Sequence, residues 1–470
     1  MKRIQLTEAG SDFSSYLTYL EQNGLLARIK EKVDTERDIG DYMYTTSMNN
    51  GPALLFENVV SADLGVKYEI PLVGALICTR ERAAVAIGTP ENEAINKCIL
   101  AQQNPIPPIT LESDPINRKI FRGEDIDLLK ILPVAKCSPS DGGKYIGTAV
   151  VLSKDPKFGR NVAISRHQVI RKNRLGIESW LPQHTAIFRS RAEERGESLK
   201  VTLALGCAPD ITIASQFKPP IGVDELGFAG GLRGRPIKLV KGKTIDNEFP
   251  VTSHIVIEGV IPKGESDHEG PFGEYTGYYG ESFDDLTVID VTAVIIREDI
   301  QPVFYGSLPM PVENDVIKEI PLESSILFSL RKNCPEVQQV RCPWYGGSDD
   351  FVIVQLKKTF EDEGKVAILG ALAATGSRPK IVIVVDDDVD VFKDTEVLNA
   401  ITYRMQPGKD VTIVRTQGNP LDPSYLLKSP EGATAIGFDA TKPFGKEYTK
   451  RIEDHRTTRL IPKPVKERFD

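Results

Sequence analysis

The chain has 470 residues, of which 40% are apolar and 26% are charged. At about 150 residues per domain, this length corresponds to roughly three domains. The ordinary content of 38 glycines and 32 prolines excludes collagen-like and disordered classes. The 58 basic and 66 acidic residues leave a net charge of -8, which argues against a broad surface for nucleic acid or anionic membrane. We therefore expect a globular protein with a small partner.

No apolar segment is long enough to serve as a membrane span. The richest, Ile381 to Val385, is only strand-sized, whereas a span needs about 18 residues. Met1 to Arg3 is followed by a polar segment rather than by an apolar signal core. The six cysteines contain no CxxC pair, which favours buried, reduced thiols over a disulfide scaffold or a zinc knuckle. Together these features predict a cytoplasmic protein.

The first hundred residues predict a mixture of helices and strands. Residues Ser11 to Asn23 have the pattern of an amphipathic helix, with capping residues at the start and Gly24 at the end. Two strand-like apolar runs and two helical stretches follow, at 53 to 56, 71 to 78, 79 to 87 and 91 to 101. The proline-rich segment Pro105 to Pro108 then interrupts the pattern and indicates a domain boundary.

The middle third is dominated by β-branched runs, and the last third alternates helices with strands. The β-branched runs predict an antiparallel sheet or barrel and lie at 147 to 153, 161 to 165, 200 to 205, 254 to 261, 287 to 296 and 302 to 305. After about residue 315 the alternation predicts an α/β layer, with strands at 351 to 357, 381 to 385 and 411 to 415 and helices at 364 to 374 and 394 to 404. In the charged tail, Phe444, Tyr448 and Ile452 have helical spacing and predict a helix that contacts a neighbouring subunit.

The segment from His268 to Glu274 is the densest group of candidate catalytic residues. It places Glu269 and Glu274 five positions apart, with two glycines, a proline and a phenylalanine between them. Such a loop can hold two carboxylates at different depths and so separate their pKa values, as acid and base catalysis requires. The alternative is a solvated turn with two ordinary surface acids. Constrained loops carry function more often than other segments do, so the catalytic interpretation remains open together with the solvated turn.

A second group combines an amide, an imidazole and a carboxylate. Asn161 opens the segment that ends at Arg166, and Gln183 and His184 follow further along the chain. With a carboxylate such as Glu225, these side chains would form a hard N/O site suited to Mn²⁺ or Mg²⁺. The alternative is that His184 is an ordinary structural histidine.

Two further segments have plainer interpretations. Ala229 to Pro236 is glycine-rich and could surround a phosphate with backbone N–H groups. It lacks the Lys-Ser/Thr ending of a P-loop, so a glycine turn between barrel strands is favoured. The acidic run from Asp386 to Asp390 could bind a cation, but a run of acids after a strand is more often a solvated loop.

Taken together, these segments resemble, in order and spacing, the UbiD family of prenylated-flavin-dependent decarboxylases. The segments that carry the resemblance are Asn161-Val-Ala-Ile-Ser-Arg166, Pro182-Gln-His184, Gly222-Val-Asp-Glu225, Ala229-Gly-Gly-Leu-Arg-Gly234, Glu258-Gly259, Glu269-Gly-Pro-Phe-Gly-Glu274 and Ile381-Val-Ile-Val-Val-Asp-Asp-Asp388. The resemblance covers almost the whole chain and implies a multidomain α/β fold. Its expected parts are an N-terminal α/β domain (1–110), a split β-barrel that binds the flavin (111–312), a C-terminal α/β domain (313–440) and a tail helix for oligomer contact (441–470).

The resemblance also implies roles for individual residues. Glu274 would be the proton donor of a Glu-Arg-Glu network with Arg166 and Glu269. A divalent metal, Mn²⁺ or Mg²⁺, would clamp the flavin phosphate from Asn161, His184 and Glu225. A less secure K⁺ site would be formed by Ala214, Ser215 and the carbonyl of Phe217. The expected cofactor-binding residues are Asn161, Ile164, Ser165, Arg166, Gln183, His184, Ser215 and Glu225.

The implied activity is a reversible, non-oxidative decarboxylation of an aromatic or heteroaromatic carboxylic acid with release of carbon dioxide. The prenylated FMN would come from a flavin prenyltransferase, and the chain would form homodimers or hexamers. Trp180 and Tyr275 are expected near the substrate and favour a flat aromatic acid. Three alternatives remain: decarboxylation of a polyprenyl hydroxybenzoate in ubiquinone synthesis, a flavin-free metal-dependent hydrolase, and a flavin-binding module without catalysis. The presence of both Glu269 and Glu274 argues against the last.

Overall fold

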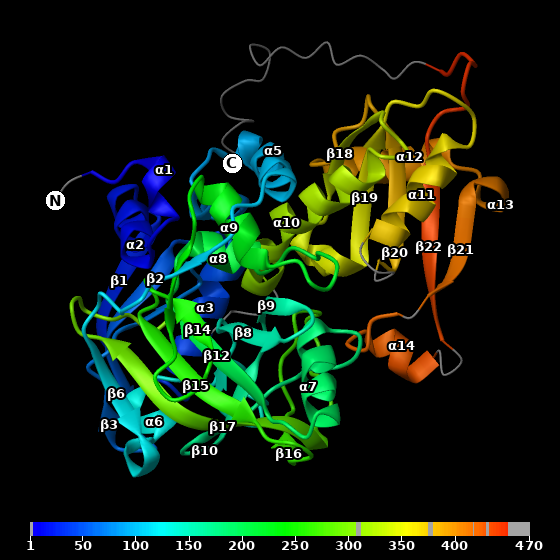
Figure 1. The fold of residues 1–470 in the computed structure, drawn as a ribbon. Helices are drawn as coiled ribbons and strands as arrows, with labels where there is room; N and C mark the ends of the chain where they lie inside the picture. Colours follow the sequence, from blue (N-terminus) through cyan, green and yellow to red (C-terminus); the bar gives the residue numbers. More distant parts are fainter. Residues whose placement is uncertain (1–2, 307–311, 375–378, 417, 429–431, 450–470) are drawn as a thin grey trace.

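The computed structural model describes residues 3–306, 312–374, 379–416, 418–428 and 432–449. Its N-terminal part combines helices with a four-stranded sheet (Figure 1). The elements are α1 (Leu6–Ala9), α2 (Phe13–Gln22), β1 (Leu26–Asp34), α3 (Asp38–Met48), β2 (Ala53–Ser61), β3 (Val66–Lys67), β4 (Leu72–Gly74), α4 (Arg80–Ala86) and α5 (Glu91–Gln103). The helices expected at 11–23, 79–87 and 91–101 are confirmed. α2 buries Phe13, Tyr16 and Leu20, and the Asp12 side chain caps it by accepting from the Ser15 N–H.

The central part is built on a ten-stranded sheet with the order β7-β10-β11-β17-β15-β12-β8-β9, to which β6 and β16 add by pairing with β17. The strands are β6 (Arg118–Arg122), β7 (Tyr145–Ile146), β8 (Val150–Asp155), β9 (Gly159–Ile164), β10 (His167–Arg171), β11 (Arg174–Gly176), β12 (Leu199–Leu205), β15 (Ile255–Ile261), β16 (Ser266–Glu269) and β17 (Phe283–Arg297). Within the described chain no pairing joins β7 to β9, so the expected split barrel is an open sheet.

Short elements surround this sheet. They are β5 (Ile109–Thr110), β13 (Lys238–Lys241) and β14 (Glu248–Pro250), which form a small three-stranded sheet, together with α6 (Leu128–Ile131), α7 (His184–Glu194), α8 (Pro209–Ala214) and α9 (Glu225–Arg233). The inward side chains of the large sheet are β-branched or leucine, among them Val151, Leu203 and Ile257, and all three are fully buried. The central strands β8, β12 and β15 are buried along almost their whole length, and their β-branched residues are the reason that the sequence favours strands here.

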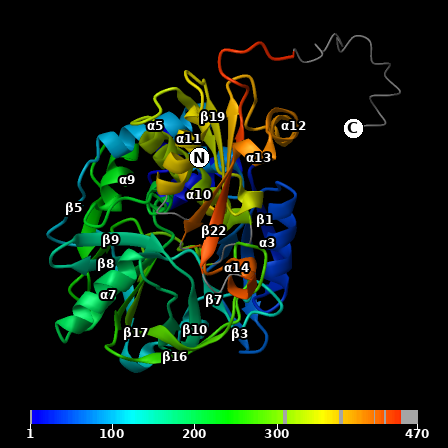
Figure 2. The same ribbon diagram turned by 90° about the vertical axis from the view of Figure 1, so that its right-hand side faces the viewer.

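The C-terminal part is an α/β layer around a five-stranded sheet of order β18-β19-β20-β22-β21, as the sequence predicts (Figure 1). Its elements are α10 (Val312–Leu330), β18 (Val337–Arg341), β19 (Phe351–Leu356), α11 (Glu363–Ala374), β20 (Ile381–Asp386), α12 (Asp394–Arg404), α13 (Pro407–Asp410), β21 (Val411–Thr416), α14 (Pro423–Lys428) and β22 (Ala433–Ala440). α10 packs against both α5 and β18, so this one helix joins the N-terminal and C-terminal parts (Figures 1 and 2).

Four sequence expectations are wrong in detail. The run at 302 to 305 forms no strand, and only Phe304 makes an isolated bridge, to Leu72. The glycine-rich segment from Ala229 lies inside the helix α9, and only Gly234 adopts a positive φ, where it ends that helix. Asp386 is not solvated: it is buried and accepts from the Arg404 guanidinium at 2.6 Å. Residues 441–449 form no helix, since Pro443 lacks an N–H and Gly445 has a φ of +68°. Ile452 and the rest of the expected tail helix lie outside the described residues.

All six cysteines are free thiols, and five of them are buried, as expected. The described part of the chain contains no helix that is both long and apolar enough to cross a membrane.

Candidate active site

Strand β9 and the N-terminal ends of α7 and α9 enclose a cavity of about 320 Å³. β9 supplies Asn161 and Ile164, and Ser165 follows where the chain turns towards β10. The cavity brings together every residue expected to bind the cofactor except Arg166. Arg166 is the next residue in the chain after Ser165, which lines the cavity. The expected residues that line it are Asn161, Ile164, Ser165, Gln183, His184, Ser215 and Glu225.

The amide, imidazole and carboxylate expected to hold a metal all line this cavity. The Asn161 side-chain NH₂ donates to the Thr185 hydroxyl at 3.1 Å, which leaves its amide oxygen available for a cation. Burial and the positive charge of Lys218 lower the pKa of His184, so its imidazole is neutral and can ligate. Within the described residues no group of three or more His, Cys, Asp or Glu side chains is placed to hold a metal. The amide of Asn161 is therefore needed to complete a three-ligand set.

Glu225 is the first residue of α9, and its carboxylate accepts from the Val162 N–H of β9 at 2.9 Å. Burial raises the pKa of Glu225 to about 8, because the charged form loses its hydration. A divalent cation in the cavity would supply the opposite charge that this carboxylate lacks. The donor set of one amide oxygen, one imidazole nitrogen and one carboxylate therefore fits a hard divalent metal.

Ser215 and Phe217 line the same cavity directly after α8, which ends at Ala214. The Ser215 hydroxyl donates to the Thr212 carbonyl at 2.7 Å and accepts from the Gln216 amide at 3.0 Å. The lining also includes Ala374, the last residue of α11. The ammonium group of Lys380, the residue before β20, pairs with Asp422 at 2.7 Å.

Arg166 lies between β9 and β10 and gathers the two expected catalytic carboxylates. Its Nε and Nη2 donate to the two oxygens of Glu269 at 3.1 and 3.2 Å, and its Nη1 donates to Glu274. All three residues are buried, with exposed fractions of 7%, 1% and 5% for Arg166, Glu269 and Glu274. Glu269 ends β16, whereas Glu274 belongs to the loop that follows. The solvated-turn alternative for the segment from His268 to Glu274 is therefore wrong for both acids.

The two acids differ in how Arg166 holds them. Burial raises the pKa of Glu274 above the ordinary glutamate range, and the nearby negative charges of Glu178 and Glu269 raise it further. The Arg166 guanidinium opposes this shift, but it contacts Glu274 through a single nitrogen and Glu269 through two. Glu274 is consequently the acid that holds a proton at neutral pH.

Glu178 is a third carboxylate on the same arginine, and the sequence analysis missed it. Its Oε2 accepts from Arg166 Nη1 at 2.7 Å, and its Oε1 accepts from the Trp180 indole N–H at 3.2 Å. The hairpin of β10 and β11 explains the contact. Its register pairs Val169 with Leu175, so Arg166, just before β10, lies close to Glu178, just after β11. The Lys172-Asn173 turn between two β-branched runs was the sequence signal that could have located this hairpin.

The two aromatic residues expected near the substrate differ in environment. Trp180 is 39% exposed and packs against the Phe283 ring, with 5.2 Å between ring centroids. Tyr275 is buried, and its hydroxyl accepts from the Asn419 amide at 2.5 Å. Tyr275 therefore has a fixed position directly beside Glu274, whereas Trp180 lies at the surface of the site.

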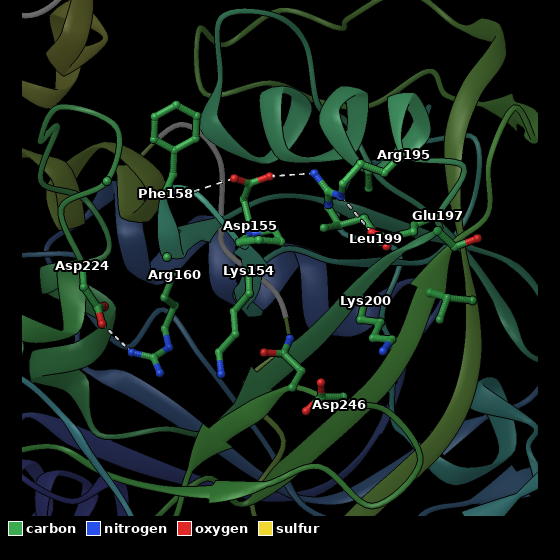
Figure 3. Close-up of a pocket in the computed structure, with 17 residues that line it drawn as sticks. Lys154, Asp155, Phe158, Arg160, Arg195, Glu197, Leu199, Lys200, Asp224 and Asp246 are labelled. Atoms are coloured by element: carbon green, nitrogen blue, oxygen red, sulfur yellow. Dashed lines mark hydrogen bonds and ion pairs between the residues drawn. The ribbon is translucent and has the colours of Figure 1, made fainter.

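A larger cavity of about 960 Å³ lies beside β8, α7 and β12 (Figure 3). Two ion pairs lie among its lining side chains: Asp155 accepts from Arg195 at 3.1 Å, and Arg160 pairs with Asp224. Asp224 also caps α9 by accepting from the Leu226 N–H at 3.0 Å, so this ion pair fixes the backbone next to Glu225. The larger cavity therefore adjoins the candidate site, but Glu225, Glu269 and Glu274 do not line it.

Comparisons with known proteins identify the family of the chain. Models of the 3-octaprenyl-4-hydroxybenzoate carboxy-lyase (UbiD) N-terminal, Rift-related and C-terminal domains match residues 17–101, 109–310 and 315–440. The UbiD-class enzyme HmfF from Pelotomaculum thermopropionicum, solved with FMN, is 36% identical over 94% of this chain and 97% of its own, with a TM-score of 0.85.

Two further solved structures are similar over nearly their full lengths. An evolved dimeric form of HmfF in complex with prenylated FMN is 35% identical over 94% of this chain and 97% of its own, with a TM-score of 0.83. The vanillic acid decarboxylase of Sedimentibacter hydroxybenzoicus in its closed form is 28% identical over 98% of this chain and 97% of its own, also with a TM-score of 0.83. The resemblance found in the sequence is confirmed, and the chain belongs to the UbiD family of carboxy-lyases.

Proposed function

We propose that this protein decarboxylates an aromatic or heteroaromatic carboxylic acid, reversibly and without net oxidation, using prenylated FMN bound in the 320 Å³ cavity. The observation that carries the proposal is the buried contact of Arg166 with Glu269 and Glu274 at the edge of that cavity. The relatives support the cofactor, since one HmfF structure holds FMN and the other holds prenylated FMN.

Asn161, His184 and Glu225 would hold a divalent metal, Mn²⁺ or Mg²⁺, which would supply positive charge to balance the flavin phosphate. Ser215, with Ala214 and the Phe217 carbonyl, supplies oxygen ligands for K⁺ near the same phosphate. Gln183, Ile164 and Ser165 contact the flavin from the lining of the cavity. When bound, the prenylated flavin supplies an electrophile that accepts the electron pair left on the substrate carbon when carbon dioxide departs.

The side chains of this protein orient the acid and deliver the proton. Arg166 pairs with the incoming carboxylate while it holds Glu269 in place through two hydrogen bonds. The bond between the ring carbon and the carboxyl carbon breaks, and carbon dioxide leaves. Glu274, which burial keeps protonated, then donates its proton to the same carbon and recovers one from solvent. Carboxylation is the same sequence in reverse.

The experiment that tests this function is co-expression with a flavin prenyltransferase, followed by absorbance spectroscopy and a screen of aromatic and heteroaromatic acids. We expect a flavin spectrum in the purified protein and carbon dioxide release from at least one acid. A protein that binds a divalent metal and hydrolyses esters or amides without flavin would contradict the proposal. The screen also shows whether the enzyme decarboxylates a small aromatic acid or a polyprenyl hydroxybenzoate.

Glu178→Gln tests the electrostatic part of the mechanism. The charge of Glu178 raises the pKa of Glu274, so its removal should lower that pKa. A proton donor acts below its pKa, and decarboxylation is lost as the pH rises through it. The alkaline limb of the profile of kcat against pH should therefore move to lower pH in Glu178→Gln. Glu194→Gln, a substitution of an exposed acid on α7, is the control and should leave the limb in place. A limb that stays fixed or moves to higher pH in Glu178→Gln would contradict this electrostatic role.

We also propose that the chain assembles as a homodimer or hexamer in the cytoplasm. The dimeric form of HmfF supports the assembly, and the six free thiols support a reducing compartment. We retain 1–110, 111–312, 313–440 and 441–470 as the proposed domain limits. Sedimentation of the flavin-loaded protein at micromolar concentration measures the assembly, and a monomer would contradict it.

A further inference from the structure

Tyr275, the residue after Glu274, belongs to the central part of the protein, but its side chain is held by the C-terminal part. It lies in the loop between β16 and β17 and is 8% exposed. The Asn419 amide, in the segment between β21 and α14, donates to its hydroxyl at 2.5 Å. The Lys318 ammonium of α10 lies 3.9 Å from the centroid of its ring. Two separate segments of the C-terminal part therefore contact one side chain of the catalytic loop.

The amide that holds the Tyr275 hydroxyl is itself fixed. Asn419 is 5% exposed, and its NH₂ group also donates to the Asp350 carboxylate at 2.9 Å. The amide oxygen of Asn419 accepts from the Leu421 N–H at 3.0 Å. Hydrogen bonds on both ends of a buried amide restrict it to one arrangement. The Tyr275 hydroxyl therefore meets a partner with a fixed position.

The backbone around Glu274 is short and hydrogen-bonded, so a shift at Tyr275 would move the acid. The Glu274 N–H donates to the Tyr278 carbonyl at 2.9 Å, which closes a tight turn around Tyr275. On the other side, the Gly273 N–H donates to Asp141 at 2.9 Å, which ties the loop to the central part. Glu274 consequently lies between one contact in the central part and one in the C-terminal part.

Packing alone does not account for a tyrosine at this position. A phenylalanine would bury the same ring without burying a hydroxyl, which costs free energy unless the hydroxyl is hydrogen-bonded. The Tyr275 hydroxyl meets that requirement through Asn419, which is 144 residues away in the chain. Tyr278, three residues further along the loop, is 63% exposed. The buried hydrogen bond therefore distinguishes Tyr275 within its own loop and joins the two parts of the protein.

Lys318 adds an electrostatic contact from the same direction. Burial raises the pKa of Glu274 most, and the charges of Glu178 and Glu269 raise it further. The positive charges of Arg166 and Lys318 lower it. Of these four charged groups, Lys318 alone belongs to the C-terminal part. The helix that contacts the Tyr275 ring therefore also affects how readily Glu274 gives up its proton.

We propose that Tyr275 is a positioning residue for the reaction: the C-terminal part holds its side chain through Asn419 and Lys318, and this contact keeps Glu274 in place for proton delivery. Decarboxylation thus depends on the contact between the central and C-terminal parts as well as on the cofactor cavity. This inference rests on the proposed function and deepens it by naming what aligns the proton donor.

The first test is the kinetics of flavin-loaded Tyr275→Phe and Tyr275→Leu with an acid that the wild type decarboxylates. Tyr275→Phe keeps the ring and loses the hydrogen bond to Asn419, so kcat should fall about three- to tenfold while KM and flavin content stay close to wild type. Tyr275→Leu loses both contacts, and its kcat should fall by about a hundredfold, as expected when a reacting group is displaced by about 1 Å.

Tyr278→Phe is the matched control, since it is the same substitution at an exposed position of the same loop, and it should keep the wild-type kcat. A change in KM alone in the Tyr275 variants would show that Tyr275 contacts the substrate instead. An unchanged kcat in both would show that it does not position Glu274. Either result overturns the proposal.

A pH profile separates an effect on the proton donor from a general loss of stability. Without the charge of Lys318 the pKa of Glu274 should be higher, so the alkaline limb of kcat against pH should move to higher pH in Lys318→Met. A residue needed only for folding would lower kcat and leave the limb in place. Lys332→Met is the matched control, because Lys332 is exposed and lies over the Phe328 ring at 4.9 Å, and it should not move the limb. A limb that stays fixed or moves to lower pH in Lys318→Met would contradict the contact.

Amide hydrogen exchange tests the contact without requiring turnover. In cofactor-free protein, the peptide that contains Glu274 and the peptide that contains Asn419 should both exchange faster in Tyr275→Phe than in the wild type, because one hydrogen bond joins them. If both exchange faster but no acid is decarboxylated, the contact stands and the proposed function is wrong. Exchange at the wild-type level in both peptides would overturn the contact whatever the kinetics. Tyr275→Phe keeps the volume of the ring, so this comparison remains decisive if Tyr275→Leu or Lys318→Met fails to fold.

Discussion

Glu274→Gln is expected to lower kcat for decarboxylation by about a hundredfold to ten-thousandfold while flavin content stays at the wild-type level. Removing a positioned general acid has an effect of this size, which corresponds to about 3–5 kcal/mol in the barrier. Glutamine keeps the size of the side chain and can still accept from Arg166 Nη1. It has no acidic proton to deliver, so the loss should appear in the chemical step. Steady-state kinetics of the flavin-loaded variant, with flavin content measured by absorbance, check this.

Hydrogen exchange gives a second measurement of the same proton transfer. The decarboxylated product should exchange the hydrogen at the former carboxyl position with deuterium from solvent in the wild type, and this exchange should be lost in Glu274→Gln. Glu281→Gln is the control, because Glu281 is an exposed acid a few residues further along the chain, and it should retain both turnover and exchange. If Glu274→Gln with full cofactor retains both, the proton donor lies elsewhere and Glu269 becomes the first candidate.

The asymmetry of the arginine contacts explains why Glu274 is preferred to Glu269 as the donor. Two parallel hydrogen bonds from Arg166 engage both carboxylate oxygens of Glu269. Glu274 shares a single nitrogen of the same guanidinium with Glu178. Burial therefore prevails at Glu274 and raises its pKa, which leaves a proton available there. Environment, not residue type, gives these two glutamates different roles.

The periodic patterns in the sequence predicted α2, α4, α5, α11 and α12 but missed other helices, such as α3 and α7. The alternation after residue 315 and the β-branched runs of the middle third both depend on local spacing, and both appear in the structure except for the run at 302 to 305. The glycine segment from Ala229 failed because its glycines are required by packing: a Cβ at Gly230 would lie 2.2 Å from the Ile106 carbonyl oxygen. Close packing of α9 against a distant segment cannot be deduced from local spacing, and it overrides the poor helix propensity of glycine.

The residues of the candidate site also divide into those that could be predicted from the sequence and those that could not. The resemblance identified Arg166, Glu269 and Glu274, and the structure brings them into contact. Glu178 depends on the register of a hairpin that the sequence analysis did not assign. The contact of the Lys318 ammonium with the Tyr275 ring, 3.9 Å from the ring centroid, depends on how α10 meets the loop after β16, two segments about forty residues apart. Contacts of this kind depend on tertiary packing, which no periodic pattern in one sequence encodes.

His184→Ala is expected to leave the protein folded and to remove most of its bound flavin. His184 contributes the imidazole to the proposed metal set, and a set of one amide and one carboxylate binds a divalent cation much less tightly. Without the metal, the negative charge of the flavin phosphate would enter a buried cavity without the divalent cation that balances it, where screening by water is weak. Loss of the metal should therefore cause loss of the flavin.

The measurement is metal content by mass spectrometry and flavin content by absorbance, on protein co-expressed with the prenyltransferase, together with a thermal melt. His268→Ala is the matched control, because His268 is an exposed histidine whose Nδ1 lies 2.9 Å from Asp284, and it should retain both metal and flavin. The melting temperatures of both variants, measured without cofactor, should be close to that of the wild type. For His184→Ala this is expected because the His184 side chain makes no hydrogen bond to a described residue. A His184→Ala protein with full metal and flavin content would show that the cavity binds the cofactor by another set of ligands.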